Sequence, residues 1–357
     1  MVPKKKIDEI LDGYDPSKLT IATLCSHSSL QIFHGARKMG FKTLGLVTKN
    51  NQKIYDAFPL AKPDRFISYS DYDDMEERAG ELLDENVVLI PHGSFVEYMG
   101  AKKFEDFAVP SYGNRAVLNW ESDRDKQRSW ITSAGAPMPR LITDAREIKE
   151  PVMVKYHGAK GGRGFFIAKD YPDFKMGIDN SQPYTIQEYC LGTRYYLHFF
   201  YDPLKTDGYR IKQGGSLELL SIDRRDESNI DEMYKLGSIE DAKRHGLYPS
   251  FVVTGNTPVV IRESLLPKAF EMAENIVNRS YELFGGMWGP FCLETVVNDK
   301  LEFRIFEIST RIVAGTNPFI NGSPYAEMIY PGMSTGARMA MEIRDAVQVG
   351  KLKTLIS

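Results

Sequence analysis

Two acidic residues near the carboxyl end of the chain have a spacing that suits metal binding. The segment 291–309 contains two strand-like runs joined by a polar turn, and these runs carry Glu294 and Glu307. Pairing of the runs as a hairpin predicts that the two carboxylates lie opposite each other, within one residue of register. They suit Mg²⁺, with Mn²⁺ as an alternative, since Mg²⁺ binds through one or two carboxylates plus substrate phosphates. The pair could instead be neutralised by Arg304 or Arg311.

A glycine-rich segment between two strand-like arms is the clearest candidate for phosphate binding. The segment 152–168 contains Lys155, and its other glycines and cations near the tip are Gly158, Lys160, Gly161, Gly162, Arg163 and Gly164. Glycine lets backbone N–H groups approach phosphate oxygens, and the cations add positive charge. No Gly-Lys-Ser/Thr run enters a helix, so the segment is not a P-loop. A solvated surface hairpin is the alternative, but cations among the glycines favour phosphate contact.

Three further turns carry polar side chains at strand ends. Gln187, Glu188 and Tyr189 end a strand-like run and could meet an adenine edge, although an acid at a strand end is usually just solvated. Near the amino end, 25–29 and 91–94 follow two strands that we expect to be neighbours. The carboxyl ends of parallel strands meet at one sheet edge. We therefore expect the side chains of these two turns to converge on a phosphorylated ligand: His27, Ser28 and Ser94. A plain helix N-cap is the alternative for Ser28.

The elements that must position these residues alternate between strand and helix in the first third of the chain. Apolar runs at 19–25, 43–47, 64–68 and 87–90 alternate with helical spacing at 28–39 and 74–83. This alternation predicts a doubly wound parallel sheet. Later segments combine strands with helices at 267–283 and 326–349, so the chain is α/β and α+β with several lobes. The predicted lobes are an amino-terminal α/β domain that contributes the nucleotide-substrate site, a small lobe with the glycine hairpin, and a large lobe with the carboxylates: 1–121, 122–205 and 206–357.

The composition of the chain argues against several classes of protein. The chain has 357 residues, 42% hydrophobic and 26% charged, which indicates folded lobes rather than disorder. A net charge of −3 argues against a nucleic-acid binder, which usually carries a basic surface. Three cysteines without a CxxC pair fit free thiols in a reducing cytosol. No signal peptide is visible and no apolar run is long enough to span a membrane, so we expect a cytoplasmic protein without membrane or nucleic-acid partners.

In chain order, the Lys155 hairpin, Glu188 and the two carboxylates resemble the ATP-grasp superfamily. Longer strings are similar to the archaeal formate-dependent synthetases of purine biosynthesis, the PurP family, from about residue 18 onward. They are ATLCSHSSL (22–30), PHGSF (91–95), YGNR (112–115), WES (120–122), DRRDESN (223–229), TGNTP (254–258), RESLL (262–266), EISTR (307–311) and GTN (315–317).

The resemblance implies an ATP-grasp fold behind an amino-terminal parallel-sheet domain, and a carbon–nitrogen ligase. Formate, ATP and 5-aminoimidazole-4-carboxamide ribonucleotide (AICAR) would give the formamido nucleotide (FAICAR), ADP and phosphate through formyl phosphate. Lys155 and Arg311 would be catalytic, and Glu294 and Glu307 would hold the metal. The nucleotide substrate would meet His27, Ser28, Ser94, Asn256 and Arg262. ATP would meet Lys155, Gly161, Gly162, Arg163, Gly164, Gln187, Glu188, Tyr189 and Asn229. The resemblance also implies a homo-oligomer, a trimer or a hexamer.

The chain departs from the general ATP-grasp pattern at two positions. The acid expected for the ribose hydroxyls is replaced by Arg194 and two tyrosines, and the asparagine expected beside the last metal carboxylate is Ser309. Asn229 and Asn317 are candidate substitutes. Another carboxylate–amine ligase acting on a phosphoribosyl substrate, and a non-catalytic nucleotide-binding regulator, are the alternatives. For formate itself we expect a small pocket with tight aromatic or branched walls near Glu294.

Overall fold

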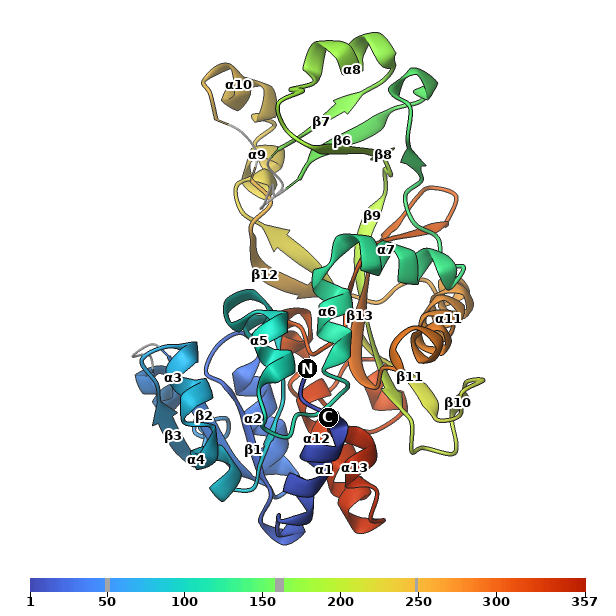
Figure 1. Cartoon of the computed structure of the whole chain (residues 1–357). Helices are drawn as coiled ribbons and strands as arrows, with labels where there is room; N and C mark the ends of the chain where they lie inside the picture. The colour runs from blue at the N-terminus through green and yellow to red at the C-terminus, as the bar shows by residue number, and fades with distance from the viewer. Residues whose placement is uncertain (49–51, 158–163, 248–249) are drawn as a thin grey trace.

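The described residues of the computed structural model, 1–48, 52–157, 164–247 and 250–357, form three sheets. A four-stranded sheet has the order β3-β2-β1-β4, and a six-stranded sheet has the order β10-β11-β9-β13-β14 with β12 beside β11. A third sheet, β5-β8-β6-β7, stands apart at the top of the view in Figure 1. Within the described residues, no helix combines the length and the apolar character needed to cross a membrane.

The first sheet is parallel, as the alternation of strands and helices predicts. Its strands are β1 (Thr20–Leu24), β2 (Lys42–Val47), β3 (Arg65–Ser68) and β4 (Val87–Leu89). Every residue of β1 and β4 is buried, as expected for a sheet covered on both faces. Its helices are α1 (Lys4–Asp12), α2 (Ser29–Lys38), α3 (Tyr72–Glu77), α4 (Ala79–Asp84), α5 (Ala101–Asp106) and α6 (Ala116–Ser122). The single helix expected at 74–83 is thus two helices that meet at Arg78.

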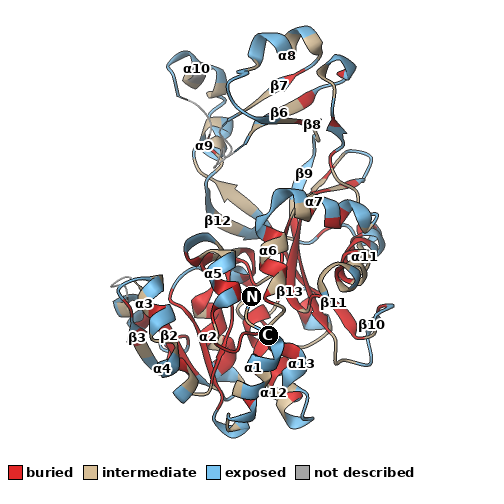
Figure 2. Cartoon of the chain, viewed as in Figure 1, coloured by how far each residue is buried: buried red, intermediate tan, exposed pale blue. Residues whose placement is uncertain are grey.

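The six-stranded sheet packs one apolar face against the main core and carries polar side chains on part of its other face. Its pairs are antiparallel, and its strands are β9 (Thr193–Asp202), β10 (Tyr209–Arg210), β11 (Ser216–Glu227), β12 (Val253–Pro258), β13 (Gly289–Val297) and β14 (Phe303–Ser309). Alternate residues such as Leu197, Phe199 and Leu293 enter the main core, which α7 (Arg124–Ser133) and α11 (Leu266–Phe284) complete. The intervening residues form the opposite face, where Phe200 and Leu220 pack in a separate hydrophobic cluster with Ile21 and Met339. The part of this face around Glu294 is polar and is called the polar face below. Figure 2 shows how much of β11 and β13 is buried between these layers.

The third sheet forms a small lobe with its own core. It contains β5 (Leu141–Ile142), β6 (Val152–Tyr156), β7 (Phe165–Ala168) and β8 (Tyr184–Glu188), beside α8 (Tyr171–Gly177). Val152, Val154 and Ile186 pack with Phe174 of α8 in a cluster separate from the main core. The strands β6 and β7 are antiparallel neighbours, so the hairpin expected around the glycines is confirmed in its arms. Its tip, residues 158–163, lies outside the described residues.

The carboxyl-terminal helices return to the first sheet. Helix α12 (Thr335–Gln348) packs on α2, and a Cβ on Gly35 would lie 2.2 Å from the backbone nitrogen of Ala337. After α13 (Leu352–Leu355), Ile356 forms a β-bridge with Tyr112. The helix expected at 326–349 begins only at Thr335, where the Ser334 hydroxyl accepts from the backbone N–H of Ala337. Two short helices, α9 (Ile230–Lys235) and α10 (Ile239–Arg244), extend from the end of β11 toward the small lobe (Figure 1).

Candidate active site

The polar face of the six-stranded sheet carries the predicted carboxylate pair. Glu294 on β13 pairs directly with Glu307 on β14, so the predicted opposition is confirmed. On its other side, Glu294 pairs with Tyr196 of β9, which in turn pairs with Asp223 of β11. Directly paired residues project from the same face of a sheet. This face therefore also carries the alternate residues along these strands: His198, Arg225, Asn256, Cys292 and Ser309.

The ladder is irregular beside Glu294. Glu294 pairs with Glu307, but Thr295 pairs with Ile305, so β14 has Phe306 as an extra residue. Such a bulge places two successive side chains on the same side of a strand. The Phe306 ring accordingly meets the Tyr196 ring edge-on, with centroids 6.2 Å apart. Aromatic side chains thus stand beside Glu294. The small-carboxylate pocket expected here stays a prediction.

Each carboxylate has an arginine partner. Arg225 contacts both oxygens of Glu294, at 2.9 and 3.3 Å, and Arg124 lies 2.9 Å from Oε2 of Glu307. Within the described residues, Arg304 and Arg311, the partners considered from the sequence, form no ion pair with either acid, although the charge of Arg311 acts to lower the pKa of Glu294. Arg304 instead lies 3.7 Å from Glu188.

Glu294 is the more deeply buried acid of the pair. It is 5% exposed, and burial raises its pKa, with a further contribution from the charge of Glu307 and an opposing one from Arg225. The Ser309 hydroxyl donates to Oε1 of Glu294 at 3.3 Å. The Glu307 side chain remains about one-third exposed. One acid is therefore fixed in the sheet while the other can meet an incoming ligand.

These oxygens fit a hard divalent cation that shares its coordination with phosphates. Two opposed carboxylates and a hydroxyl supply oxygen ligands, whereas no group of three His, Cys, Asp or Glu side chains suits a metal within the described ranges. Mg²⁺ commonly takes its remaining ligands from substrate phosphates and water. The two candidate asparagines are engaged elsewhere. Asn317 Oδ1 accepts from Gln31 at 3.2 Å, and Asn229 Oδ1 accepts from the backbone of Ser250 at 2.6 Å.

The two amino-terminal turns converge as predicted. His27 follows β1 and His92 follows β4, and their rings stack with centroids 5.5 Å apart and planes within 6°. Ser94 Oγ donates to Ser26 Oγ at 3.0 Å. Ser28 occupies the N-cap of α2, yet its hydroxyl makes no capping bond and lies 3.0 Å from His27 Nδ1.

These turns face the polar face of the large sheet. His27 is exposed, but protein nearby displaces solvent and, together with the positive charges of Arg311 and Arg225, lowers its pKa to about 4. Arg225 is the residue that binds Glu294. Arg311 lies 2.9 Å from Glu121, whose other oxygen accepts from the backbone and hydroxyl of Thr310. The histidine turns and the carboxylate pair thus share one electrostatic environment.

The small lobe adds Lys155 to the same region. Lys155 is on β6 and its side chain is exposed, but protein nearby displaces solvent and lowers its pKa. Arg124 and Arg194 lower the pKa further, and Glu307 opposes them. Lys155 is thus close enough to the Arg124–Glu307 pair for their charges to act on it.

Other predicted ATP contacts lie on β8, an inner strand of this sheet, and directly after it. Glu188 Oε2 accepts from the backbone of Arg140 at 3.1 Å, Gln187 pairs with Met153, and the Tyr189 N–H donates to Pro151 O at 3.3 Å. Gly164 has φ of +74°, which glycine adopts without strain. Gly161, Gly162 and Arg163 lie outside the described residues.

The structure does not join every predicted residue to this cluster. Asn256 belongs to the polar face through its Asp223 contact. Arg262 is exposed at the start of a short 3₁₀ turn, and no described acid forms an ion pair with it. Asn229, also exposed, begins α9 with φ of +53°. These two residues stay predictions.

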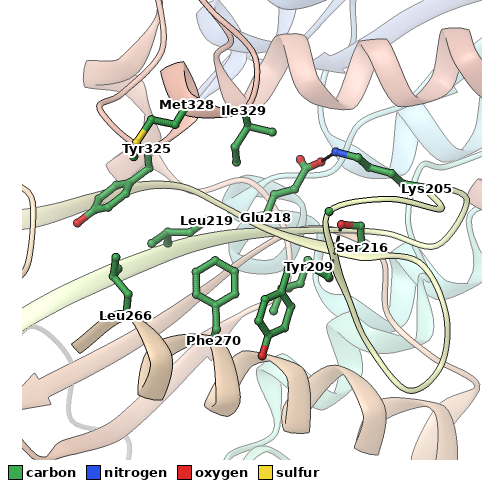
Figure 3. A pocket seen from close by; sticks show the side chains of 12 residues that line it. Lys205, Tyr209, Ser216, Glu218, Leu219, Leu266, Phe270, Tyr325, Met328 and Ile329 are labelled. Carbon is green, nitrogen blue, oxygen red and sulfur yellow. Dashed lines mark hydrogen bonds and ion pairs between the residues drawn. The ribbon is translucent and has the colours of Figure 1, made fainter. Parts of the chain in front are cut away.

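A separate cavity of about 290 Å³ lies between β11, α11 and the segment near Met328 (Figure 3). Leu266, Phe270 and Tyr325 make most of its wall apolar, and the Lys205–Glu218 ion pair lies at one end. No residue predicted from the sequence for ATP, nucleotide or metal binding lines it. The polar face is therefore the candidate active site.

Sequence reasoning missed Arg225 and Arg124, the partners of the two carboxylates, and the contact of His198 with the buried Asp223. The signal was the alternation of polar and apolar residues along 193–227, which predicts a strand with one polar face even inside a core. The string DRRDESN entered the argument only as a resemblance, yet it carries Asp223 and Arg225.

Comparison with known proteins places the chain in a family. Residues 21–142 match a family described as a protein of unknown function (DUF1246), and residues 176–357 match a domain of unknown function (DUF1297). The 5-formaminoimidazole-4-carboxamide-1-β-D-ribofuranosyl 5′-monophosphate synthetases of Methanococcoides burtonii and Methanothrix thermoacetophila are each 56% identical over the whole of both chains. That of Pyrococcus abyssi is 45% identical over 94% of this chain and 98% of its own. The chain belongs to this synthetase family.

Solved structures agree with this assignment. The IMP biosynthesis protein PurP from Thermococcus kodakaraensis superposes with a TM-score of 0.71 and 27% identity, over 94% of this chain and all of its own. An ADP complex of N5-carboxyaminoimidazole ribonucleotide synthetase gives a TM-score of 0.62 at 15% identity, over 93% of this chain and 78% of its own. The predictions of PurP membership, an ATP-grasp fold and a ligase are confirmed. The role of each site residue stays a prediction.

Proposed function

We propose that this member of the synthetase family formylates the amino group of AICAR, using formate and ATP and releasing ADP and phosphate. One observation carries the proposal furthest: Arg225 binds Glu294 and also acts on the pKa of His27. A phosphate-and-metal region and a turn region suited to a nucleotide monophosphate are therefore adjacent. Transfer of an activated acyl group between two bound substrates requires this adjacency.

In the proposed reaction, a formate oxygen attacks the γ-phosphorus of ATP, giving formyl phosphate and ADP. The amino nitrogen of AICAR then attacks the formyl carbon, a C–N bond forms, the C–O bond to phosphate breaks, and the amine loses a proton. Phosphoryl transfer needs mainly positioning and charge neutralisation. Lys155 and Arg124 provide positive charge beside Glu307, and Arg311 provides it beside the histidine turns. Mg²⁺ held by Glu294 and Glu307 would neutralise phosphate charge when bound.

Formate is too small to be bound tightly. Its three heavy atoms limit binding to roughly −4.5 kcal/mol, near millimolar affinity. Selectivity must therefore come from a pocket that excludes larger acids. Tyr196 and Phe306, which stand beside Glu294, are suited to form that wall. We expect a millimolar KM for formate and little turnover of acetate.

Release of ADP, measured with each substrate omitted in turn, tests the proposal. The full mixture should release ADP and form FAICAR, and omission of AICAR or formate should reduce ADP release to background. Release of ADP at an unchanged rate when AICAR or formate is omitted would contradict the assignment. AICAR binding without any turnover would favour the second candidate, a nucleotide-binding regulator.

Three wider features are part of the proposal. ATP with Mg²⁺ would bind between the small lobe and the polar face. The protein would act in the cytoplasm as a trimer or hexamer, which light scattering coupled to gel filtration tests. The lobe limits 1–121, 122–205 and 206–357 would mark functional units, although β9 is central in the large sheet and α12 packs on α2.

A further inference from the structure

A buried carboxylate links two residues of the polar face. Asp223 has no exposed surface, and its Oδ1 lies 2.6 Å from Nε2 of His198, which is 2% exposed. Its Oδ2 accepts from Nδ2 of Asn256 at 2.8 Å. The segment 314–319 closes over them, and a Cβ on Gly315 would lie 2.3 Å from Oδ1 of Asp223. A side chain at Gly315 would therefore displace the carboxylate.

The chemistry of this contact fixes the orientation of the Asn256 amide. An ionised carboxylate only accepts hydrogen bonds, so both of its partners must donate. His198 must carry its proton on Nε2, and Asn256 must turn its nitrogen inward. Asn256 is half-buried, and no described residue donates to its Oδ1. The atom that Asn256 can offer to a ligand is consequently an acceptor.

We propose that Asp223 and His198 are positioning residues that make Asn256 a specificity determinant for the carboxamide of the nucleotide substrate. This inference rests on the proposed function. Strand β12, which carries Asn256, is separated from β13, which carries Glu294, by β11 and β9. The amine must face the activated formyl group near Glu294, so the neighbouring carboxamide is the group left for Asn256. The N–H of the substrate carboxamide would donate to Oδ1 of Asn256, whereas a substrate carboxylate at that position would place two hydrogen-bond acceptors against each other.

The discriminating experiment compares two ligands without ATP or formate. Isothermal titration calorimetry would measure the affinity of the protein for AICAR and for the same ribonucleotide with a 4-carboxylate. The native protein should prefer the carboxamide by about tenfold or more. In Asp223→Asn, one oxygen becomes a donor, so the Asn256 amide can turn over and present its nitrogen. The preference should then fall by about tenfold, which corresponds to about 1.4 kcal/mol.

Further variants separate positioning from general structural damage. Asn256→Ala should also lose the preference, and His198→Gln, which can still donate to Asp223, should retain more of it than His198→Leu. KM for ATP and the melting temperature should change little in Asp223→Asn. Ser221→Ala is the matched control, because Ser221 is buried and pairs with His198 but its hydroxyl lacks a partner among the described residues. It should keep the native preference.

The outcomes distinguish the inference from the proposed function. An unchanged preference in both Asp223→Asn and Asn256→Ala, or no preference in the native protein, would overturn the inference while formylation stands. A native protein that neither binds AICAR nor needs it for ADP release would instead overturn the proposed function.

Discussion

At the scale of single residues, two acids that face each other have different environments. Glu294 is buried with Arg225, whereas Glu307 is partly exposed with Arg124. The sequence predicted their opposition, because the apolar residues around them define two strands and the polar turn between them fixes a hairpin. The sequence did not predict that Arg225 and Arg124 pair with these acids. The two arginines lie on β11 and α7, and their contact with the acids depends on how segments distant in the sequence pack together.

The carboxylates should be needed for catalysis but not for folding. Glu307→Gln removes a charge from a partly exposed position, so the melting temperature should change by only a few degrees. Loss of a metal ligand should lower kcat by roughly 100-fold or more, about 3 kcal/mol of transition-state stabilisation. ADP release measured over a Mg²⁺ titration, together with a melting curve, checks both statements.

A remote acid provides the matched control for this substitution. Glu271 on α11 is exposed and pairs with Lys268, so Glu271→Gln should keep native turnover. Full activity of Glu307→Gln at low Mg²⁺ would remove Glu307 from the metal site.

His92 should make folding sensitive to acid. Its Nε2 donates to Leu24 O and its Nδ1 accepts from the Ser94 N–H, which requires the neutral ring, and burial lowers its pKa to about 3. Below the ordinary histidine pKa of about 6.5, His92 binds a proton in the unfolded chain but stays neutral in the folded chain. The unfolding free energy therefore falls as the pH falls. Between pH 7 and pH 4.5, the native protein should lose about 2 to 3 kcal/mol more unfolding free energy than His92→Gln. Urea unfolding at both pH values measures the difference, and equal losses would show that His92 is not the titrating group.

At the scale of elements, alternation in the sequence predicted strands well and their irregularities poorly. The parallel order of the first sheet and the convergence of its two turns followed from strand–helix alternation. The bulge at Phe306 did not, because a ladder with one extra residue differs little in energy from a regular one until the neighbouring strand is known. The tip of the glycine hairpin lies outside the described residues, so its phosphate contacts stay a prediction.

The contact between α2 and α12 should not tolerate a side chain at Gly35. A Cβ there would lie 2.2 Å from the Ala337 nitrogen, and one on Gly336 would lie 2.3 Å from Gln31 O. Gly35→Ala must therefore push the helices apart and should cost about 3 kcal/mol of unfolding free energy. Gly80→Ala is the control, since no atom lies within 4 Å of its Cβ, and it should be neutral or slightly stabilising. Urea denaturation of both variants tests the contrast, and equal stabilities would contradict it.

At the scale of the whole molecule, sequence indicated several lobes but could not show how the chain ends are joined. A further hydrophobic cluster, distinct from the main core and from the small-lobe cluster, contains residues from both ends of the chain. They include Ile21 and Ile32 near the start and Met339, Ile343 and Ile356 near the end. Local patterning cannot reveal such a contact, because more than 300 residues separate its partners.

A fragment of residues 1–121 should consequently not fold alone. It would expose the face of α2 that α12 covers and would lose the bridge from Ile356 to Tyr112. We expect a broad urea transition for the fragment, against a cooperative one for the full chain, with circular dichroism as the measurement. A sharp transition in the isolated fragment would show that its core is self-sufficient.

The extra residue in β14 has a consequence for how acyl preference could change over time. Removal of Phe306 would let Ile305 and Glu307 remain opposite Thr295 and Glu294, now in an uninterrupted ladder. The core-facing residues would stay where they are, and only the aromatic ring would be lost. A deletion of three nucleotides could thus enlarge the space beside Glu294 and Glu307 without disturbing the strand that holds Glu307, which would give a lineage a short route from formate to bulkier acids.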